Sequence, residues 1–303
     1  MKQRVIALGF FDGVHLGHGA LLRRTVEEAR SRGCTTAVFT FDRLPREVVT
    51  GIPCPLINSP ADRSDLLQRL YGIDEVLMVP FDQSMMNTEW DAFVTDLLVE
   101  RYGAVHLVAG DDHRFGRRNG GTPELLQALC ARLGLGCDII PDVRINGTSV
   151  SSTHIRALLE QGRTEEAAAF LGHPHRLSGT VRHGNRIGRT IGVPTVNLTV
   201  PDGVLTPAHG VYAARVTLPD GTVRPAVTNI GLRPTVGDNG GVTVESWLLD
   251  FEGNLYDAHI RVEFFTRLRE EVRFGSLDAL KAQIRQDADA VRRYFAENTA
   301  LPE

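Results

Sequence analysis

Two histidines near the start of the chain are the first residues whose spacing could serve chemistry. His15 and His18 lie in GFFDGVHLGH at positions 9–18, after a short apolar run. Side chains three positions apart share one face of a helical turn, and a helix N-terminus presents N–H groups and a positive dipole to phosphate. Gly17 leaves room for a nucleotide to approach the backbone. The pattern favours a phosphate-binding site over a capped helix with two incidental histidines.

Hydroxyl and cationic side chains recur in SSTHIR at positions 151–156. Taken alone, Ser152 and Thr153 could simply cap a helix. Together with the two histidines, hydroxyls that contact phosphate and the guanidinium of Arg156 indicate a site that stabilises charge on a nucleotide. A turn of alternating charge, GDDHRFG at 110–116, follows another apolar run, and spacing alone leaves its role open.

A glycine- and arginine-rich stretch spans positions 179–197. Gly184, Gly188 and Arg189 lie in a segment that could wrap phosphates through backbone N–H groups, although a solvated turn is the commoner reason for such a composition. Thr195 and Asn197 follow a proline, and their side-chain oxygens are hard ligands that suit Mg²⁺.

Glu245 stands in an apolar run at 242–250, where strand alternation places it on one face with Trp247 and Leu249. A carboxylate among apolar neighbours is partly desolvated, which favours a role as a general base. An exposed strand glutamate is the alternative from position alone.

The sequence pattern that indicates secondary structure changes at about residue 172. Up to residue 172, short apolar runs alternate with amphipathic stretches, which predicts a parallel sheet flanked by helices. Ligands of such sheets bind at the carboxyl ends of strands. Strands are expected at 5–8, 35–41, 75–79 and 105–109, and helices at 17–32, about 60–70, 88–102, 122–133, 152–161 and 164–171.

After residue 172, β-branched runs are separated by Gly, Pro and Asp-Gly turns, which predicts a small antiparallel barrel. Its strands are expected at 177–181, 211–218, 224–230, 242–250 and 260–265, with a closing helix over 276–297. The predicted fold is therefore α/β followed by β, with a Rossmann-like domain over 1–172 and a β-barrel domain with a C-terminal helix over 173–303.

Composition limits the remaining classes of protein. The 303 residues carry 33 Lys and Arg against 37 Asp and Glu, and a net charge of −4 lacks the basic footprint of a general nucleic-acid binder. No apolar run approaches the roughly 18 residues of a bilayer span, so no membrane partner is expected. The four cysteines form no C-x-x-C pair, which favours reduced thiols in a cytoplasmic protein. The oligomeric state stays open, a homo-oligomer included.

Taken together, the motifs resemble those of the prokaryotic bifunctional riboflavin kinase/FMN adenylyltransferase family, also called FAD synthetase. HLGH is similar to the HIGH-type nucleotidylyltransferase signature, SSTHIR to the S-S-T-x-x-R element, and GDDHRFG to the flavin-site element G-x-D-F-x-F-G. The riboflavin kinase pattern is matched by the stretch that ends in PTVN, by NIGLRPT at 229–235, and by LREE at 268–271 with Gln283, Ile284 and Asp287.

The resemblance implies that the second domain phosphorylates riboflavin with MgATP and that the first adenylylates the FMN product to FAD, with release of pyrophosphate. The phosphate of FMN then attacks ATP itself, and no protein nucleophile is required. For the first domain the resemblance implies catalysis by His15, His18 and Arg156, ATP binding by Gly9, Phe10, Gly17, Ser152 and Thr153, and flavin binding by Asp112 and Phe115. For the second it implies Glu245 as the base, Gly184, Gly188 and Arg189 at ATP, and Thr195 and Asn197 at Mg²⁺.

Some positions depart from the family pattern, mostly in the first half. Phe10 replaces the usual Asn of G-N-F-D-G, and Arg43-Leu44-Pro45 stands where a His-Pro pair is usual. His113 replaces the first Phe of D-F-x-F-G, and Asp257 replaces a Gly. These departures concern flavin affinity more than chemistry. They leave two alternatives: an enzyme with one working module, preferentially the kinase, and a flavin- or nucleotide-binding sensor without turnover.

Overall fold

The computed structural model describes residues 2–182, 193–232 and 241–298. Contacts divide the chain into two compact units, Met1–Leu56 with Pro60–Ser152, and Ile57–Ser59 with Thr153–Glu303. The helices α7 (Ser152–Glu160) and α8 (Thr164–Leu171) therefore pack almost wholly with the second unit. The position of the functional domain boundary, at residue 172, stays a prediction.

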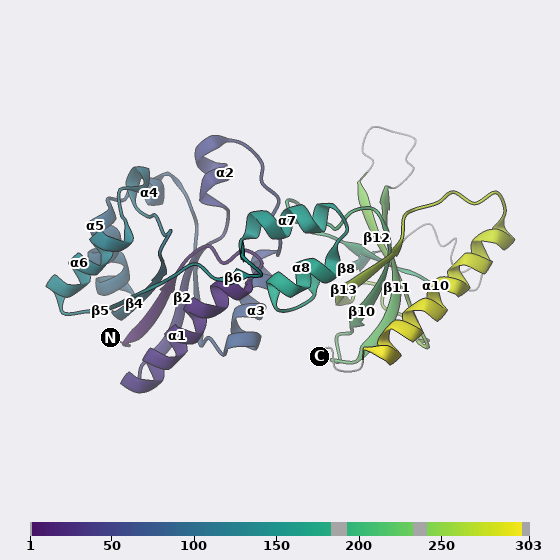
Figure 1. Cartoon of the computed structure of the whole chain (residues 1–303), viewed down its shortest axis with the longest axis horizontal. Coiled ribbons are helices and arrows are strands. Elements are labelled where there is room, and N and C mark those ends of the chain that lie inside the picture. Colours follow the sequence, from purple (N-terminus) through teal and green to yellow (C-terminus); the bar gives the residue numbers. More distant parts are fainter. Residues whose placement is uncertain (1, 183–192, 233–240, 299–303) are drawn as a thin grey trace. The chain divides into compact units, whose positions relative to one another are not determined.

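A parallel five-stranded sheet in the order β3-β2-β1-β4-β5 forms the centre of the first unit (Figure 1). The sheet confirms the predicted Rossmann-like architecture. The strand order reverses between β1 and β4, which leaves a crevice at their carboxyl ends. The elements are β1 (Arg4–Leu8), α1 (Leu16–Arg32), β2 (Thr35–Phe41), α2 (Pro45–Thr50), α3 (Pro60–Tyr71), β3 (Glu75–Val79), α4 (Gln83–Met86), α5 (Trp90–Ala92), the π-helix η1 (Phe93–Arg101), β4 (Ala104–Gly110), the 3₁₀-helix η2 (Arg117–Asn119), α6 (Pro123–Leu133), β5 (Gly136–Ile140), β6 (Arg144–Ile145) and β7 (Thr148–Ser149).

Both faces of this sheet are covered, which explains why its central strands are continuous apolar runs. One face packs Ile6 and Phe39 against Phe93 of η1 and Leu126 of α6. The opposite face packs Ala7 and Val38 against α1 and α3, through side chains that include Leu22, Leu66 and Leu67. The sheet is thus a rigid support for the loops that leave its carboxyl edge.

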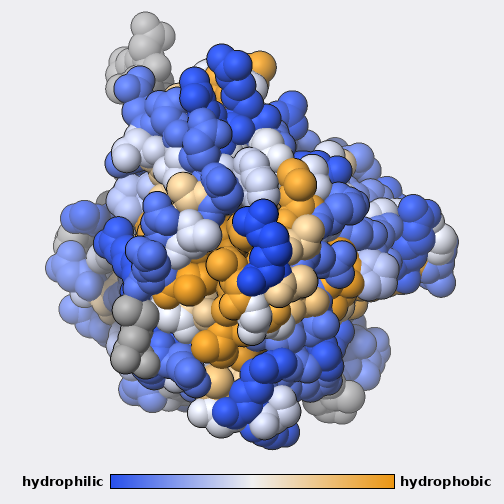
Figure 2. Space-filling model, turned by 90° about the vertical axis from the view of Figure 1, so that its left-hand side faces the viewer, coloured by the Kyte–Doolittle hydropathy of each residue, from blue (hydrophilic) through white to orange (hydrophobic). Residues whose placement is uncertain are grey.

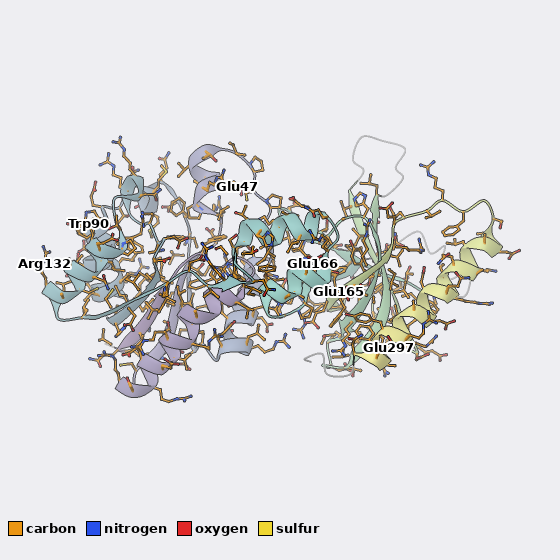
Figure 3. All side chains as sticks on the ribbon, viewed as in Figure 1. Glu47, Trp90, Arg132, Glu165, Glu166 and Glu297 are labelled. Carbon is orange, nitrogen blue, oxygen red and sulfur yellow. The ribbon has the colours of Figure 1, made fainter. Side chains whose placement is uncertain are left out.

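A closed antiparallel barrel in the order β10-β11-β12-β9-β8-β13 forms the second unit, and the long helix α10 runs along its outside (Figure 1). The barrel confirms the predicted architecture of this half. Glu165 in the first turn of α8, labelled in Figure 3, hydrogen-bonds Tyr294 of α10. The elements are β8 (His175–Arg182), β9 (Val196–Thr199), β10 (Gly210–Thr217), β11 (Val223–Leu232), β12 (Val242–Leu248), β13 (His259–Arg269) and α10 (Leu277–Glu297).

Some elements differ from the sequence-based expectation. β5 and β9 were not expected as strands, because polar residues interrupt their apolar runs, Asp138 in β5 and Asn197 in β9. The helix expected over 88–102 consists of the short α5 followed by nine residues of π-helix. A π-helix bonds each N–H to the fifth residue back, and apolar spacing does not distinguish it from an α-helix over two turns.

Apolar side chains gather on the end of the first unit near α5 and α6 (Figure 2). Leu125 and Leu133 of α6 are 38% and 43% exposed there, while Trp90 and Arg132 mark the same end in Figure 3. Apolar atoms make up much of any protein surface, so this patch by itself assigns no function. In the part of the chain that the structure describes, no helix is long and apolar enough to cross a membrane.

Gly136 at the start of β5 allows the buried ring of His106 to approach the backbone, because a Cβ there would overlap the ring. We expect Gly136→Ala to lower the free energy of unfolding by about 1–3 kcal/mol, through overpacking of a site that cannot expand. Urea unfolding measures the change. Gly275→Ala is the control, since its Cβ would meet no atom within 4 Å; equal effects of both substitutions would contradict the packing argument.

Two candidate active sites

A pocket of about 490 Å³ opens at the carboxyl ends of β1 and β4, where the strand order reverses. It lies where ligands of open α/β sheets bind. Segments far apart in the sequence meet there: the turn after β1, the turn after β4, and the stretch that leads into α7. The predicted residues that line it are Gly9, Phe10, His15, Gly17, His18, Asp112 and Ser152.

Three other predicted residues of this module lie elsewhere. Phe115 is 6% exposed and packs in the core, with its ring 5.5 Å from that of Phe93. Thr153 and Arg156 belong to α7 and to the second unit. Their predicted roles in flavin, ATP and pyrophosphate binding stay predictions.

The two histidines are held together by the start of α1. His15 is the N-cap, and its Nδ1 accepts a hydrogen bond of 3.2 Å from the backbone N–H of His18. A neutral His15 therefore carries its proton on Nε2. The two rings stack with centroids 3.5 Å apart and planes at 14°. Gly17 permits this close packing, because a Cβ there would lie only 3.1 Å from the His15 ring and 3.2 Å from the carbonyl oxygen of Val150.

His18 is an uncharged group at neutral pH. Burial lowers the pKa of His18 well below 6.5, and the neighbouring His15 and Arg63 lower it further. Among the described residues its buried Nδ1 has no hydrogen-bond partner. A neutral imidazole in this position can donate or accept a hydrogen bond at a phosphate, together with the free N–H groups of the α1 N-terminus.

The turn between β1 and α1 is strained. Phe11 and Val14 have φ angles of 59° and 44°, in the left-handed region that β-branched residues in particular avoid. Neighbouring segments hold this turn: Ser152 Oγ donates to the carbonyl oxygen of Asp12 at 2.9 Å. Ser152 therefore joins the SSTHIR segment to the turn that carries the histidines.

A second pocket, of about 330 Å³, lies between the outward face of the barrel and α10. Strand alternation in β12 directs Val244, Ser246 and Leu248 inward, whereas Glu245 and Trp247 line this pocket. The pocket also contains Thr195, Asn229, Arg269, Glu271, Phe274 and Asp287.

Glu245 stands between two amide side chains on neighbouring strands. In the ladder it is opposite Asn197 of β9 on one side and Asn229 of β11 on the other. The Nδ2 of Asn229 donates to Glu271 Oε1 at 3.0 Å. The carboxylate is thus placed by two backbone ladders that join three strands, which fix its position more precisely than a loop would.

Helix α10 forms one wall of this pocket, and an ion pair fixes it there. Arg269 at the end of β13 donates to both carboxylate oxygens of Asp287, at 3.0 Å from Nε to Oδ1 and 2.8 Å from the terminal nitrogen to Oδ2. Gln283 Nε2 donates to the same carboxylate at 3.0 Å. A bidentate pair gives geometric specificity as well as energy.

Thr195 also lines a neighbouring pocket of about 270 Å³, formed with Pro194, Leu248, Phe251 and Tyr256. A residue shared by two pockets marks the place where two substrates could meet. Asn197, two positions further on, has a buried Oδ1 without a hydrogen-bond partner among the described residues. The predicted phosphate-binding residues Gly184, Gly188 and Arg189 lie outside the described residues.

Sequence reasoning did not find several lining residues. Phe274 and Phe251 are single aromatic residues in polar loops. Arg63, whose charge acts on His18, lies in a helix where arginine is ordinarily a surface residue.

A nucleotide-type pocket in a Rossmann-like unit, and a barrel pocket with a carboxylate between two amides, define a two-site transferase. The family model described as FAD synthetase matches residues 1–154, and that described as riboflavin kinase matches residues 171–295. The chain belongs to the bifunctional riboflavin kinase/FMN adenylyltransferase family, which confirms the resemblance inferred from the motifs.

Relatives of known description match along nearly the whole chain. The bifunctional riboflavin kinase/FMN adenylyltransferase of Pseudomonas fluorescens is 38% identical over 292 residues, which cover 96% of this chain and 93% of the relative. The same-named protein of Escherichia coli K12 is 38% identical over 298 residues, with 96% and 92% covered. A solved structure described as a macrolide-efflux protein from Streptococcus pneumoniae has a TM-score of 0.84 at 30% identity, and covers 96% of this chain and 94% of that one.

His113 gives this module a measurable pH dependence. Its half-buried ring stacks on Phe115, with centroids 5.5 Å apart, and its Nε2 is shielded from solvent. Burial, with a smaller effect of Arg114, lowers the pKa of His113 to about 4. The unfolded state therefore binds a proton more readily, so this residue makes stability fall as the pH drops below about 6.5 towards 4.

We expect His113→Phe to remove this sensitivity, because phenylalanine keeps the ring contact and cannot titrate. Between pH 7 and pH 5 the variant should lose about 1–2 kcal/mol less unfolding free energy than the parent protein. Urea unfolding at the two pH values gives the comparison. Parallel losses in the two proteins would show that His113 titrates as freely in the folded chain as in the unfolded one.

Proposed function

We propose that this chain makes FAD in two steps, phosphorylating riboflavin in the barrel unit and adenylylating FMN in the Rossmann-like unit. The observation that carries the proposal is that part of each predicted residue set lines a pocket of its own. His15, His18 and Ser152 gather at the switch point of the sheet, and Glu245 with Thr195 lines the barrel pocket. The family membership supports the same two activities.

In the kinase step the riboflavin lies in the pocket of Glu245, between Trp247 of β12 and the loop that carries Phe274. Glu245 accepts the proton of the terminal ribityl hydroxyl, and that oxygen attacks the γ-phosphorus of ATP. The bond from the γ-phosphorus to the β,γ-bridging oxygen breaks, and ADP leaves. The adenosine part of ATP occupies the neighbouring pocket of Phe251 and Tyr256, so that the triphosphate reaches Thr195, which borders both pockets.

Magnesium fits the residues between these pockets. Asn197 offers a buried oxygen without another partner in the described chain, and Thr195 offers a hydroxyl. No group of three His, Cys, Asp or Glu side chains that could hold a metal occurs among the described residues. Mg²⁺ is ordinarily held by one or two protein oxygens together with substrate phosphates, and it neutralises charge on the triphosphate.

In the adenylyl step ATP lies in the 490 Å³ pocket with its phosphates at the N-terminus of α1. The FMN phosphate attacks the α-phosphorus, and pyrophosphate leaves. His15, His18 and the backbone N–H groups donate hydrogen bonds to the phosphate oxygens as charge builds on them. Catalysis here consists of positioning and charge stabilisation.

Two substitutions should separate the two activities. Glu245→Gln keeps the shape of the site but removes the base, so FMN formation should fall at least about 100-fold while adenylylation of supplied FMN persists. His18→Ala should reduce FAD formation from FMN by about 100-fold and leave riboflavin phosphorylation unchanged. Chromatographic separation of the flavins, after incubation with ATP and Mg²⁺, measures both rates.

The exposed residues Glu297 and His259 provide matched controls as Glu297→Gln and His259→Ala. Loss of both activities in either test variant would argue against independent sites. Riboflavin that stops at FMN in the parent protein, with supplied FMN untouched, would leave a kinase alone, and binding of flavin without any product would indicate a sensor.

A further inference from the structure

One arginine is buried beneath the adenylyl-transfer pocket. Arg63 of α3 has no exposed surface, and it is one of the largest fully buried side chains in the described chain. Its two terminal nitrogens donate to the carbonyl oxygens of Phe10, at 2.9 Å, and Phe41, at 2.5 Å. The second also lies 3.9 Å from the sulfur of Met78. The guanidinium therefore contacts the carboxyl ends of β1, β2 and β3 together.

The charge is retained at this position despite its cost. Burial lowers the pKa of Arg63 to about 10, whereas the charges of Asp12 and Asp42 act in the opposite direction. The residue is therefore a cation at neutral pH. An apolar side chain of similar size would fill the core without the desolvation penalty, so packing alone does not explain an arginine.

Besides its hydrogen bond to the carbonyl oxygen of Phe10, Arg63 contacts the side chain of that residue. The guanidinium carbon lies 4.3 Å from the centroid of the Phe10 ring, in cation–π contact. The Phe10 carbonyl oxygen also accepts a hydrogen bond of 2.9 Å from Thr40 Oγ1. Phe10 lines the pocket, and the next residue, Phe11, begins the strained turn that leads to His15. Arg63 thus holds that turn at Phe10, and Ser152 holds it at Asp12.

We propose that Arg63 is a positioning residue for adenylyl transfer, which fixes the turn between β1 and α1 so that His15 and His18 are held against the phosphates of ATP. This inference rests on the function proposed above. Two non-glycine residues with positive φ would relax without such restraints. A displacement of about 1 Å at reacting groups can cost about 100-fold in rate.

Arg63→Met removes the charge and both hydrogen bonds but keeps most of the buried volume. We expect kcat for FAD formation from FMN to fall by about 10- to 100-fold, with KM for ATP changed less than about threefold, because the pocket walls from residues 110–113 and 140–152 remain. Arg63→Lys keeps the charge but cannot span two carbonyl groups, and it should recover part of the lost kcat.

The controls separate positioning from stability. Arg69→Met changes the same residue type on the same helix, at a partly exposed position that pairs with Asp65, and should leave kcat unchanged. Riboflavin phosphorylation by each preparation reports whether the chain is intact, and urea unfolding shows that the assay temperature lies below the transition.

The outcomes distinguish a failure of the positioning role from a failure of the proposed function. If the parent protein forms FAD and a folded Arg63→Met variant has the parental kcat, the positioning role is wrong although the proposed function stands. If the methionine variant does not fold, the lysine variant decides in its place, and a parental kcat there has the same meaning. If the parent protein forms no FAD from FMN, the proposed function of this unit fails, and the positioning role fails with it.

Discussion

The backbone turn after β1 is the constraint on which the first unit depends. The chain leaves the sheet at Gly9 and enters α1 at Leu16, and between them Phe11, Gly13 and Val14 all have positive φ. Such a turn does not persist through its own preferences, since two of the three residues carry a Cβ. It persists because hydrogen bonds hold it from outside: from Thr40 and Arg63 at Phe10, and from Ser152 at Asp12. In this arrangement the site is part of the sheet edge, and its strain is balanced by buried polar contacts.

The barrel unit achieves the same rigidity by other means. Glu245, Asn197 and Asn229 come from three adjacent strands, so the ladder hydrogen bonds themselves fix their spacing. The ion pair from Arg269 to Asp287, together with the hydrogen bond from Gln283 to the same carboxylate, ties α10 to the end of β13. A regular sheet holds the Glu245 carboxylate at defined distances from its neighbours. The pocket of the first unit instead has beside it the free N–H groups of a helix start.

Much of both architectures could be predicted from the sequence, because buried parallel strands are apolar runs and barrel strands alternate between turn residues. β5 was not predicted as a strand because Asp138 within it is polar. In the structure, Asp138 contacts His106 and forms an ion pair with Arg24. The histidine pair could be proposed because its motif is local in sequence, whereas Glu245 could be proposed as a base only through the family resemblance, since its position alone fits an exposed strand glutamate. Arg63 could not, although it precedes Leu66 and Leu67 by three and four positions and so lies on the apolar face of α3. Its partners are carbonyl groups on other strands, and such a relation has no signature in a single sequence.

The two departures from the family pattern at this pocket have a common physical character. Phe10 presents a ring that is held from behind by Arg63, and His113 presents a ring that is stacked on Phe115. With a pKa of about 4, His113 is uncharged at neutral pH, so both positions contribute flat, neutral surfaces to the wall of the pocket. Neither side chain displaces His15, His18 or Ser152, which are tied to the turn and to the start of α1 by hydrogen bonds of their own. The departures therefore alter the surface of the pocket, while the two histidines and Ser152 are held by a separate set of hydrogen bonds.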